Sequence, residues 1–150
     1  MTDSGAYSYQ QRNQSLNTAE ILFEKYCNEK QYFIRRLGFD EKNDPVPDFF
    51  NLNPFIRNLP DYIINNNDTL SALVMVKGTA NIKQKEYNLI PQMRDFYSSE
   101  KCPLVYCFCF RNTQPIFLHI KKVMDLYKNS IDQQWHDGVI YRNLKLPNNK

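Results

Sequence analysis

The stretch PDYIINNNDTLSALVMVKGT, residues 60–79, decides the fold class of this 150-residue chain. A short segment that opens with an acid, 61–64, and an apolar run, 70–76, flank four polar residues at 65–68. Asn and Asp tolerate left-handed backbone angles, so this segment predicts a turn between two strands. The run over 70–76 is apolar on both faces except for Ser71, which is typical of a strand in the middle of a covered sheet.

Upstream of this hairpin, the sequence predicts a helix and then a strand. Asn17 and Glu20 form a capping-box pattern, and apolar residues at helical spacing extend the helix to about residue 29 or 30. A strand begins at 32–34. Prolines then keep residues 43–60 irregular.

Downstream of the hairpin, helices and strands alternate. The pattern predicts a helix over 82–97 that Pro91 kinks or divides, strands over 104–110 and 115–119, a helix over 120–127 and a last strand over 138–141. A turn is expected at 135–138. His119 is expected to have a structural role. Elements mixed in this way predict an α/β fold, a central mixed sheet flanked by helices.

Length and composition predict one domain over 17–150, preceded by a flexible polar arm over 1–16. The net charge of +3, from 19 basic and 16 acidic residues, permits a nucleic-acid partner without requiring one. The absence of a long apolar run predicts no membrane partner, and the absence of a secretory signal indicates a cytoplasmic, intracellular protein. The Asn-rich composition is typical of AT-rich coding, as in some phages.

The four cysteines are Cys27, Cys102, Cys107 and Cys109, and no two of them form a CxxC pair. Cys107 and Cys109 would share one face of a strand. They could form a metal pair or be small buried core residues, and we favour the core.

An acid that opens the second strand and a lysine that closes the third make this chain resemble the PD-(D/E)xK nuclease superfamily. That group includes restriction enzymes and Holliday-junction resolvases. The match runs from Pro60-Asp61 through the hairpin to Met75-Val76-Lys77, and methionine stands where the motif has its second acid. The resemblance implies an αβββαβ restriction-endonuclease-like core with C-terminal additions. It also implies an endonuclease, a hydrolase of DNA or RNA phosphodiester bonds that uses Mg²⁺ or Mn²⁺.

The expected chemistry assigns roles to Asp61 and Lys77. Residues two apart on a strand face the same way, so an acid at position 75 would sit beside Lys77. Asp61 is predicted to be a catalytic metal ligand, since Mg²⁺ prefers oxygen, and Lys77 to stabilise charge on the phosphate. The sulfur of Met75 does not bind Mg²⁺. Activity has therefore been lost, or another acid replaces the missing one, or the strands pair differently; Glu86 is the best replacement ligand.

Further candidates lie on the first helix and on basic segments. Glu20 and Glu24 share one helix face. The resemblance implies that a first-helix glutamate points into the metal site, so both are predicted metal ligands and Glu20 a catalytic residue. The alternative is a capping role for Glu20 and a solvated Glu24. Arg35, Arg36 and Lys85 are predicted to contact nucleic acid, or else to be solvated side chains.

Three hypotheses stay open. The first is a metal-dependent nuclease-like protein. The second is a catalytically inactive nuclease-fold module that binds nucleic acid or protein partners, and Met75 is its main support. The third is an unrelated α/β interaction protein. The resemblance to resolvases also suggests a possible homodimer.

Overall fold

The computed structural model describes residues 18–37, 59–67 and 70–147. The predicted arm over 1–16, the cap at Asn17 and most of the irregular segment over 43–60 lie outside the described residues.

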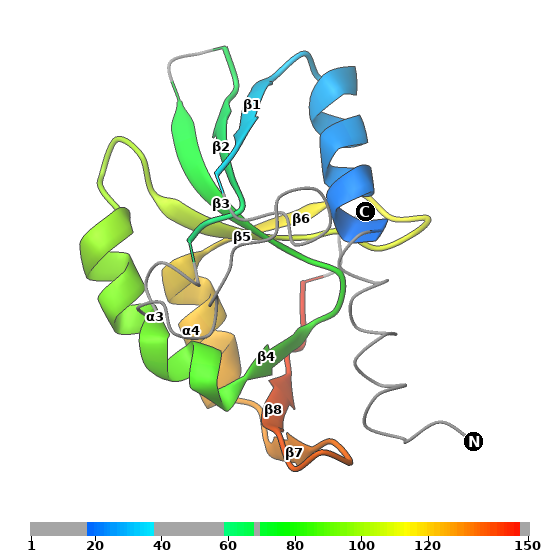
Figure 1. The fold of residues 1–150 in the computed structure, drawn as a ribbon, viewed down its shortest axis with the longest axis vertical. Helices are drawn as coiled ribbons and strands as arrows, with labels where there is room; N and C mark the ends of the chain where they lie inside the picture. The colour runs from blue at the N-terminus through cyan, green and yellow to red at the C-terminus, as the bar shows by residue number, and fades with distance from the viewer. Residues whose placement is uncertain (1–17, 38–58, 68–69, 148–150) are drawn as a thin grey trace, which may run out of the picture.

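The described elements alternate between helix and strand much as the pattern predicts. Residues 18–29 are helical and are called the N-terminal helix below; it is the blue helix in Figure 1. It is followed by β1 (Phe33–Arg36), β2 (Tyr62–Asn65), β3 (Ser71–Lys77), β4 (Asn81–Lys83), α3 (Gln84–Tyr97), β5 (Leu104–Phe108), β6 (Ile116–His119), α4 (Ile120–Lys128), β7 (Asp132–Gln134) and β8 (Ile140–Asn143).

A five-stranded mixed sheet forms the centre of the fold, in the order β1-β2-β3-β5-β6. β3 and β5 are parallel, whereas the other neighbours are antiparallel. The parallel pair needs a crossover connection, and α3 provides it. β3 is the middle strand, as its two apolar faces predict. The predicted α/β fold with a central mixed sheet is therefore confirmed.

Helices cover both faces of this sheet (Figure 1). Val74 and Val76 of β3 belong to the buried cluster that contains Phe23 of the N-terminal helix. Met75 belongs to the other buried cluster, with Ile90 of α3 and Val123 of α4. Because successive strand residues point to opposite faces, β3 holds the two layers of helix together.

A second, three-stranded sheet, in the order β4-β8-β7, is a correction to the prediction. The helix expected from residue 82 starts at Gln84, because residues 81–83 pair with β8 instead and bury Ile82. β7 was not predicted, since its sequence DQQ has no apolar residue; its pairing with β8 holds it as a strand. The last strand covers 140–143 rather than 138–141.

Several smaller predictions can be compared with the described residues. Pro91 does not divide α3, which runs from Gln84 to Tyr97. His119 has the structural role expected of it, since its Nδ1 accepts the Lys121 N–H at 3.2 Å and caps α4. Cys107 and Cys109 are buried core residues, with their sulfurs 3.5 Å apart.

Candidate functional site

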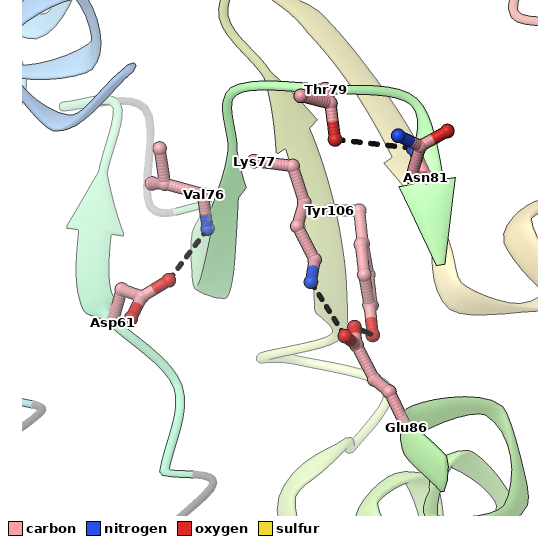
Figure 2. A network of polar contacts seen from close by, with 7 residues as sticks. All are labelled: Asp61, Val76, Lys77, Thr79, Asn81, Glu86 and Tyr106. Atoms are coloured by element: carbon pink, nitrogen blue, oxygen red, sulfur yellow. Dashed lines mark hydrogen bonds and ion pairs between the residues drawn. The ribbon is translucent and has the colours of Figure 1, made fainter. Parts of the chain in front are cut away.

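Three of the predicted site residues lie at one end of the central sheet, where Lys77 contacts Glu86 and Asp61 is hydrogen-bonded to the backbone of Val76 (Figure 2). Asp61 immediately precedes β2, Lys77 is the last residue of β3, and Glu86 lies in the first turn of α3. They come from three elements that the α/β topology brings to the same end of the sheet. The chain between Lys77 and Glu86 is short, because only a loop and β4 separate β3 from α3.

Asp61 is held by the part of β3 that extends beyond its pairing with β2. The β2–β3 ladder ends at Val74, opposite Tyr62. The Asp61 backbone N–H donates to the Val74 carbonyl at 2.9 Å. Its Oδ2 accepts the Val76 N–H at 2.8 Å. The carboxyl group therefore takes the place of a backbone acceptor and is fixed beside the end of β3.

Glu86 is held by two donors from neighbouring strands. The Lys77 Nζ lies 2.5 Å from Glu86 Oε1, and the Tyr106 hydroxyl donates to Glu86 Oε2 at 2.5 Å. The Lys77 Nζ also lies 5.9 Å from the centre of the Tyr106 ring. Only 18% of the Lys77 side chain and 15% of the Glu86 side chain are exposed, so this ion pair is largely shielded from water.

Position 75 holds a side chain of the hydrophobic core and not a metal-binding carboxylate. The Met75 side chain packs among apolar residues and is 8% exposed. Met75 and Lys77 both face α3, as the strand alternation predicts. The carboxylate that contacts Lys77 comes from Glu86, nine residues further along the chain. The sequence had singled out Glu86 as the replacement for an acid at 75.

Burial raises the pKa of Asp61 to about 6. The Val76 N–H and the charge of Lys77 lower this pKa, whereas the charges of Glu20 and Glu86 raise it further. All three charged side chains therefore lie close enough to influence Asp61. A carboxyl group with such a pKa changes charge near neutral pH, which is common among functional carboxyl groups.

The first-helix glutamates contact residues of β1 and β2. Glu20 forms an ion pair with Arg36 of β1 at 2.5 Å, and Glu24 accepts a hydrogen bond from the Tyr62 hydroxyl at 2.8 Å. Burial and, after it, this bond raise the pKa of Tyr62. The helix face that Glu20 and Glu24 share is therefore turned toward β1 and β2. Of the two carboxylates, Glu20 is the one whose charge acts on Asp61.

The three basic residues predicted to contact nucleic acid are placed on the surface. Arg36 is exposed, pairs with Glu20 and lies 5.9 Å from the Tyr62 ring centre. Arg35 on β1 and Lys85 on the first turn of α3 are also exposed. Of the three, Lys85 is next to Glu86 in sequence and therefore nearest to the candidate site along the chain.

Tyr106 was not singled out by the sequence. It is fully buried and lies beside Met75 in the parallel pairing of β3 with β5. Burial and the neighbouring Glu86 carboxylate raise its pKa well above the usual value, so it stays a hydrogen-bond donor. A tyrosine in an apolar strand is unremarkable in sequence, because the register of two parallel strands is set by packing.

Replacing Tyr106 with phenylalanine is expected to lower the free energy of unfolding by about 1.5–3 kcal/mol, the usual contribution of a hydrogen bond to a charged group. The matched control is Tyr127→Phe. The Tyr127 hydroxyl is buried and has no hydrogen-bond partner among the described residues, so its removal should be neutral or stabilising. Urea unfolding of both variants measures the difference. Equal losses in the two variants would show that the Tyr106 hydroxyl does not hold Glu86.

The donor groups fit a divalent cation that is bound only in part by protein. The described residues contain no group of three or more His, Cys, Asp or Glu side chains that could enclose a metal ion. Asp61 and Glu86 nevertheless offer two carboxylates at one sheet end. Mg²⁺ usually keeps several waters and binds through one or two carboxylates together with substrate phosphates. The chemistry of these residues therefore fits Mg²⁺ or Mn²⁺ completed by water and phosphate.

Comparison with protein-family models, curated proteins and solved structures found no match for this chain. Among the described residues, no helix is long and apolar enough to cross a membrane.

Proposed function

We propose that this chain is a metal-dependent nuclease of the PD-(D/E)xK type, which hydrolyses phosphodiester bonds in DNA or RNA. In this proposal Glu86 replaces the acid that is missing at Met75. The observation that carries the proposal is the contact between Lys77 and Glu86 at the same sheet end as Asp61. Two carboxylates and a lysine are the side chains that this chemistry requires.

The order of the elements supports the proposal. Among the described residues, the order is the N-terminal helix, β1, β2, β3, β4, α3 and β5, and β3 lies parallel to β5. This is the helix–strand–strand–strand–helix–strand order that the resemblance implies, with β4 added. The acid precedes the second strand and the lysine ends the third, as the motif demands.

Each side chain of the candidate site has its own role in this proposal. Asp61 and Glu86 would hold Mg²⁺ or Mn²⁺, which when bound activates water and polarises a phosphate oxygen. Lys77 would stabilise the negative charge that builds on the phosphate. Tyr106 positions Glu86 through its hydroxyl group. Glu20 lies near enough to Asp61 to act as a further carboxylate, whereas Glu24 is engaged with Tyr62.

The alternative is a catalytically inactive nuclease-fold module that binds nucleic acid or protein partners. The same contacts also favour this alternative. Lys77 and Tyr106 already donate hydrogen bonds to Glu86 without a substrate. In that case the ion pair only stabilises the junction of β3, β5 and α3. The homodimer suggested by the resemblance stays a prediction.

Cleavage assays with Mn²⁺ separate the two functions. Single-stranded, double-stranded and branched DNA, together with RNA, are incubated with the protein, and an excess of EDTA is the metal-free control. Lys77→Ala and Glu86→Gln are expected to lower the cleavage rate by about 10²-fold or more, since the first removes the charge that stabilises the transition state and the second a carboxylate that would hold the metal. The matched controls are Lys122→Ala and Asp125→Asn, two exposed residues of α4.

The pattern across variants decides the outcome. Loss in both site variants with full activity in both controls supports the proposal. The nuclease proposal is contradicted if the unaltered protein cleaves no substrate, or if both site variants still cleave. Either result favours the inactive module.

A further inference from the structure

The second sheet has one face that is turned away from the core. Tyr141 of the middle strand β8 lies opposite Lys83 of β4 on one side and opposite Gln133 of β7 on the other. Strand alternation puts these residues on one face with the facing pair Asn81 and Asn143. We define the outer face as these five residues together with Trp135, whose ring stacks on Tyr141: Asn81, Lys83, Gln133, Trp135, Tyr141 and Asn143.

The opposite face of this sheet packs against the helices. Ile82 is fully buried. Arg142 donates from Nε to Asp132 at 2.7 Å and from Nη1 to the Tyr127 carbonyl at 2.8 Å. Its guanidinium carbon lies 4.5 Å from the centre of the Tyr127 ring. The inner face is therefore anchored to α4, and the residues of the outer face are exposed or half-buried.

The outer face is organised by contacts among its own side chains. The rings of Trp135 and Tyr141 stack with their centres 4.3 Å apart and their planes at 20°. The Tyr141 hydroxyl donates to Gln133 Oε1 at 3.0 Å, and Asn143 Nδ2 donates to Asn81 Oδ1 at 2.8 Å. The Lys83 Nζ lies 6.0 Å from the Trp135 ring centre. These contacts hold two aromatic rings and three amides in place before any partner binds.

The chemistry of this face suits nucleic acid. Its six residues comprise a lysine, three amides and two aromatic rings, and none of them is a carboxylate. Aromatic rings stack with bases of any sequence, amides hydrogen-bond to base edges, and lysine neutralises a phosphate. The nearest acid in the turn is Asp137, whose Oδ1 accepts the Val139 N–H at 3.2 Å.

The outer face also adjoins the candidate site. Asn81 lies four residues after Lys77, and Figure 2 shows the chain running from Lys77 past Thr79 to Asn81. Lys83 immediately precedes α3, which carries Glu86 in its first turn. A strand bound at Asn81 and Lys83 would therefore lie next to the chain segments that carry Lys77 and Glu86.

We propose that the outer face binds single-stranded DNA or RNA, with bases against the Trp135–Tyr141 stack and a phosphate at Lys83. The inference rests on the proposed function and deepens it, since it assigns the substrate class. A single strand is required because the faces of paired bases are covered by stacking within a duplex.

Trp135 is the only tryptophan of the chain, and its fluorescence tests the proposal directly. The unaltered protein is titrated in EDTA with a single-stranded DNA oligonucleotide, the RNA of the same sequence, and the corresponding duplex. We expect saturable quenching with the single strands and binding to the duplex weaker by at least about fivefold, the loss of one base–aromatic stack. Equal affinity for the duplex, or no change with any nucleic acid, overturns the proposal.

Variants locate the binding to this face. Anisotropy of a labelled single strand is used, because it does not depend on Trp135. Trp135→Ala and Lys83→Ala are each expected to weaken binding by at least about fivefold. The matched controls are Phe96→Ala, an exposed aromatic residue at the far end of α3, and Lys122→Ala on α4. Lys83 is exposed, so its replacement separates lost binding from lost folding.

The outcome is independent of catalysis. Binding in EDTA that depends on Trp135 and Lys83, without any cleavage in Mn²⁺, supports the outer face and contradicts the nuclease proposal. Cleavage in Mn²⁺ with binding that neither variant changes contradicts the outer face alone.

Discussion

Asparagine at position 61 is expected to reduce Mn²⁺-dependent cleavage to the level of the metal-free control and, at neutral pH, to make the fold more stable. The loss of activity follows because Asp61→Asn removes one of the two carboxylates assigned to the metal. Asn keeps an oxygen that can accept the Val76 N–H, so the local structure should survive. Opposite changes in activity and stability are typical of groups retained for function rather than for folding.

The gain in stability follows from the direction of the pKa shift. Burial raises the pKa of Asp61 from 3.8 to about 6, so the folded state binds the proton more tightly than the unfolded state. The favourable contribution is complete below pH 3.8 and is lost as the pH rises through 6. Above that pH the charged carboxylate costs up to about 3 kcal/mol, which the neutral amide avoids.

Denaturant unfolding of the unaltered protein and of Asp61→Asn, at pH 4, 5, 6, 7 and 8, measures this difference. The free energies of unfolding should diverge as the pH rises from 3.8 to about 6 and run parallel above it. A difference that is constant across the whole range would show that Asp61 is not the group with the raised pKa. Cleavage by the variant at the wild-type rate would remove Asp61 from the site.

Aspartate at position 75, the residue that the family motif would place there, is expected to destabilise the protein by about 3–5 kcal/mol, the cost of a buried charge without a partner. Met75 is 8% exposed and packs with Ile90 and Leu104. The nearby Glu86 carboxylate repels a second negative charge, and the donors Lys77 and Tyr106 are already engaged with Glu86.

Met75→Leu is the matched control, since it nearly conserves volume and should cost less than about 1.5 kcal/mol. Urea unfolding at pH 7 compares the two variants. A further test combines Met75→Asp with Glu86→Gln. If that double variant is as stable as the unaltered protein and cleaves at a comparable rate, position 75 can still hold the acid and the assignment to Glu86 is wrong.

The hairpin over 60–79 shows how much the sequence predicts. A strand that is apolar on both faces has to be buried on both, so β3 was expected at the middle of a covered sheet and lies there. The flanking helices also follow from local periodicity. Asp61 and Lys77 were found because they end these apolar runs, where a charged side chain can reach solvent or a ligand.

Other features depend on residues that are distant in sequence. β7 has no apolar residue, and β4 looks like the first turn of a helix; both are strands because β8 supplies their hydrogen bonds. The same holds for the pair of Glu20 with Arg36, which joins the N-terminal helix to β1. A pattern along the chain cannot report such pairings, because they are decided by which segments pack together.

The sequence by itself determined the α/β class, the central position of β3 and the charged ends of the two hairpin strands, since burial demands an apolar period that can be counted along the chain. Only the tertiary structure decided that Glu86 meets Lys77, that Tyr106 holds Glu86, and that Trp135 and Tyr141 share the outer face of a second sheet. The reason is that strand register and helix placement depend on how the whole core packs, and side chains far apart in sequence meet only once that packing is complete.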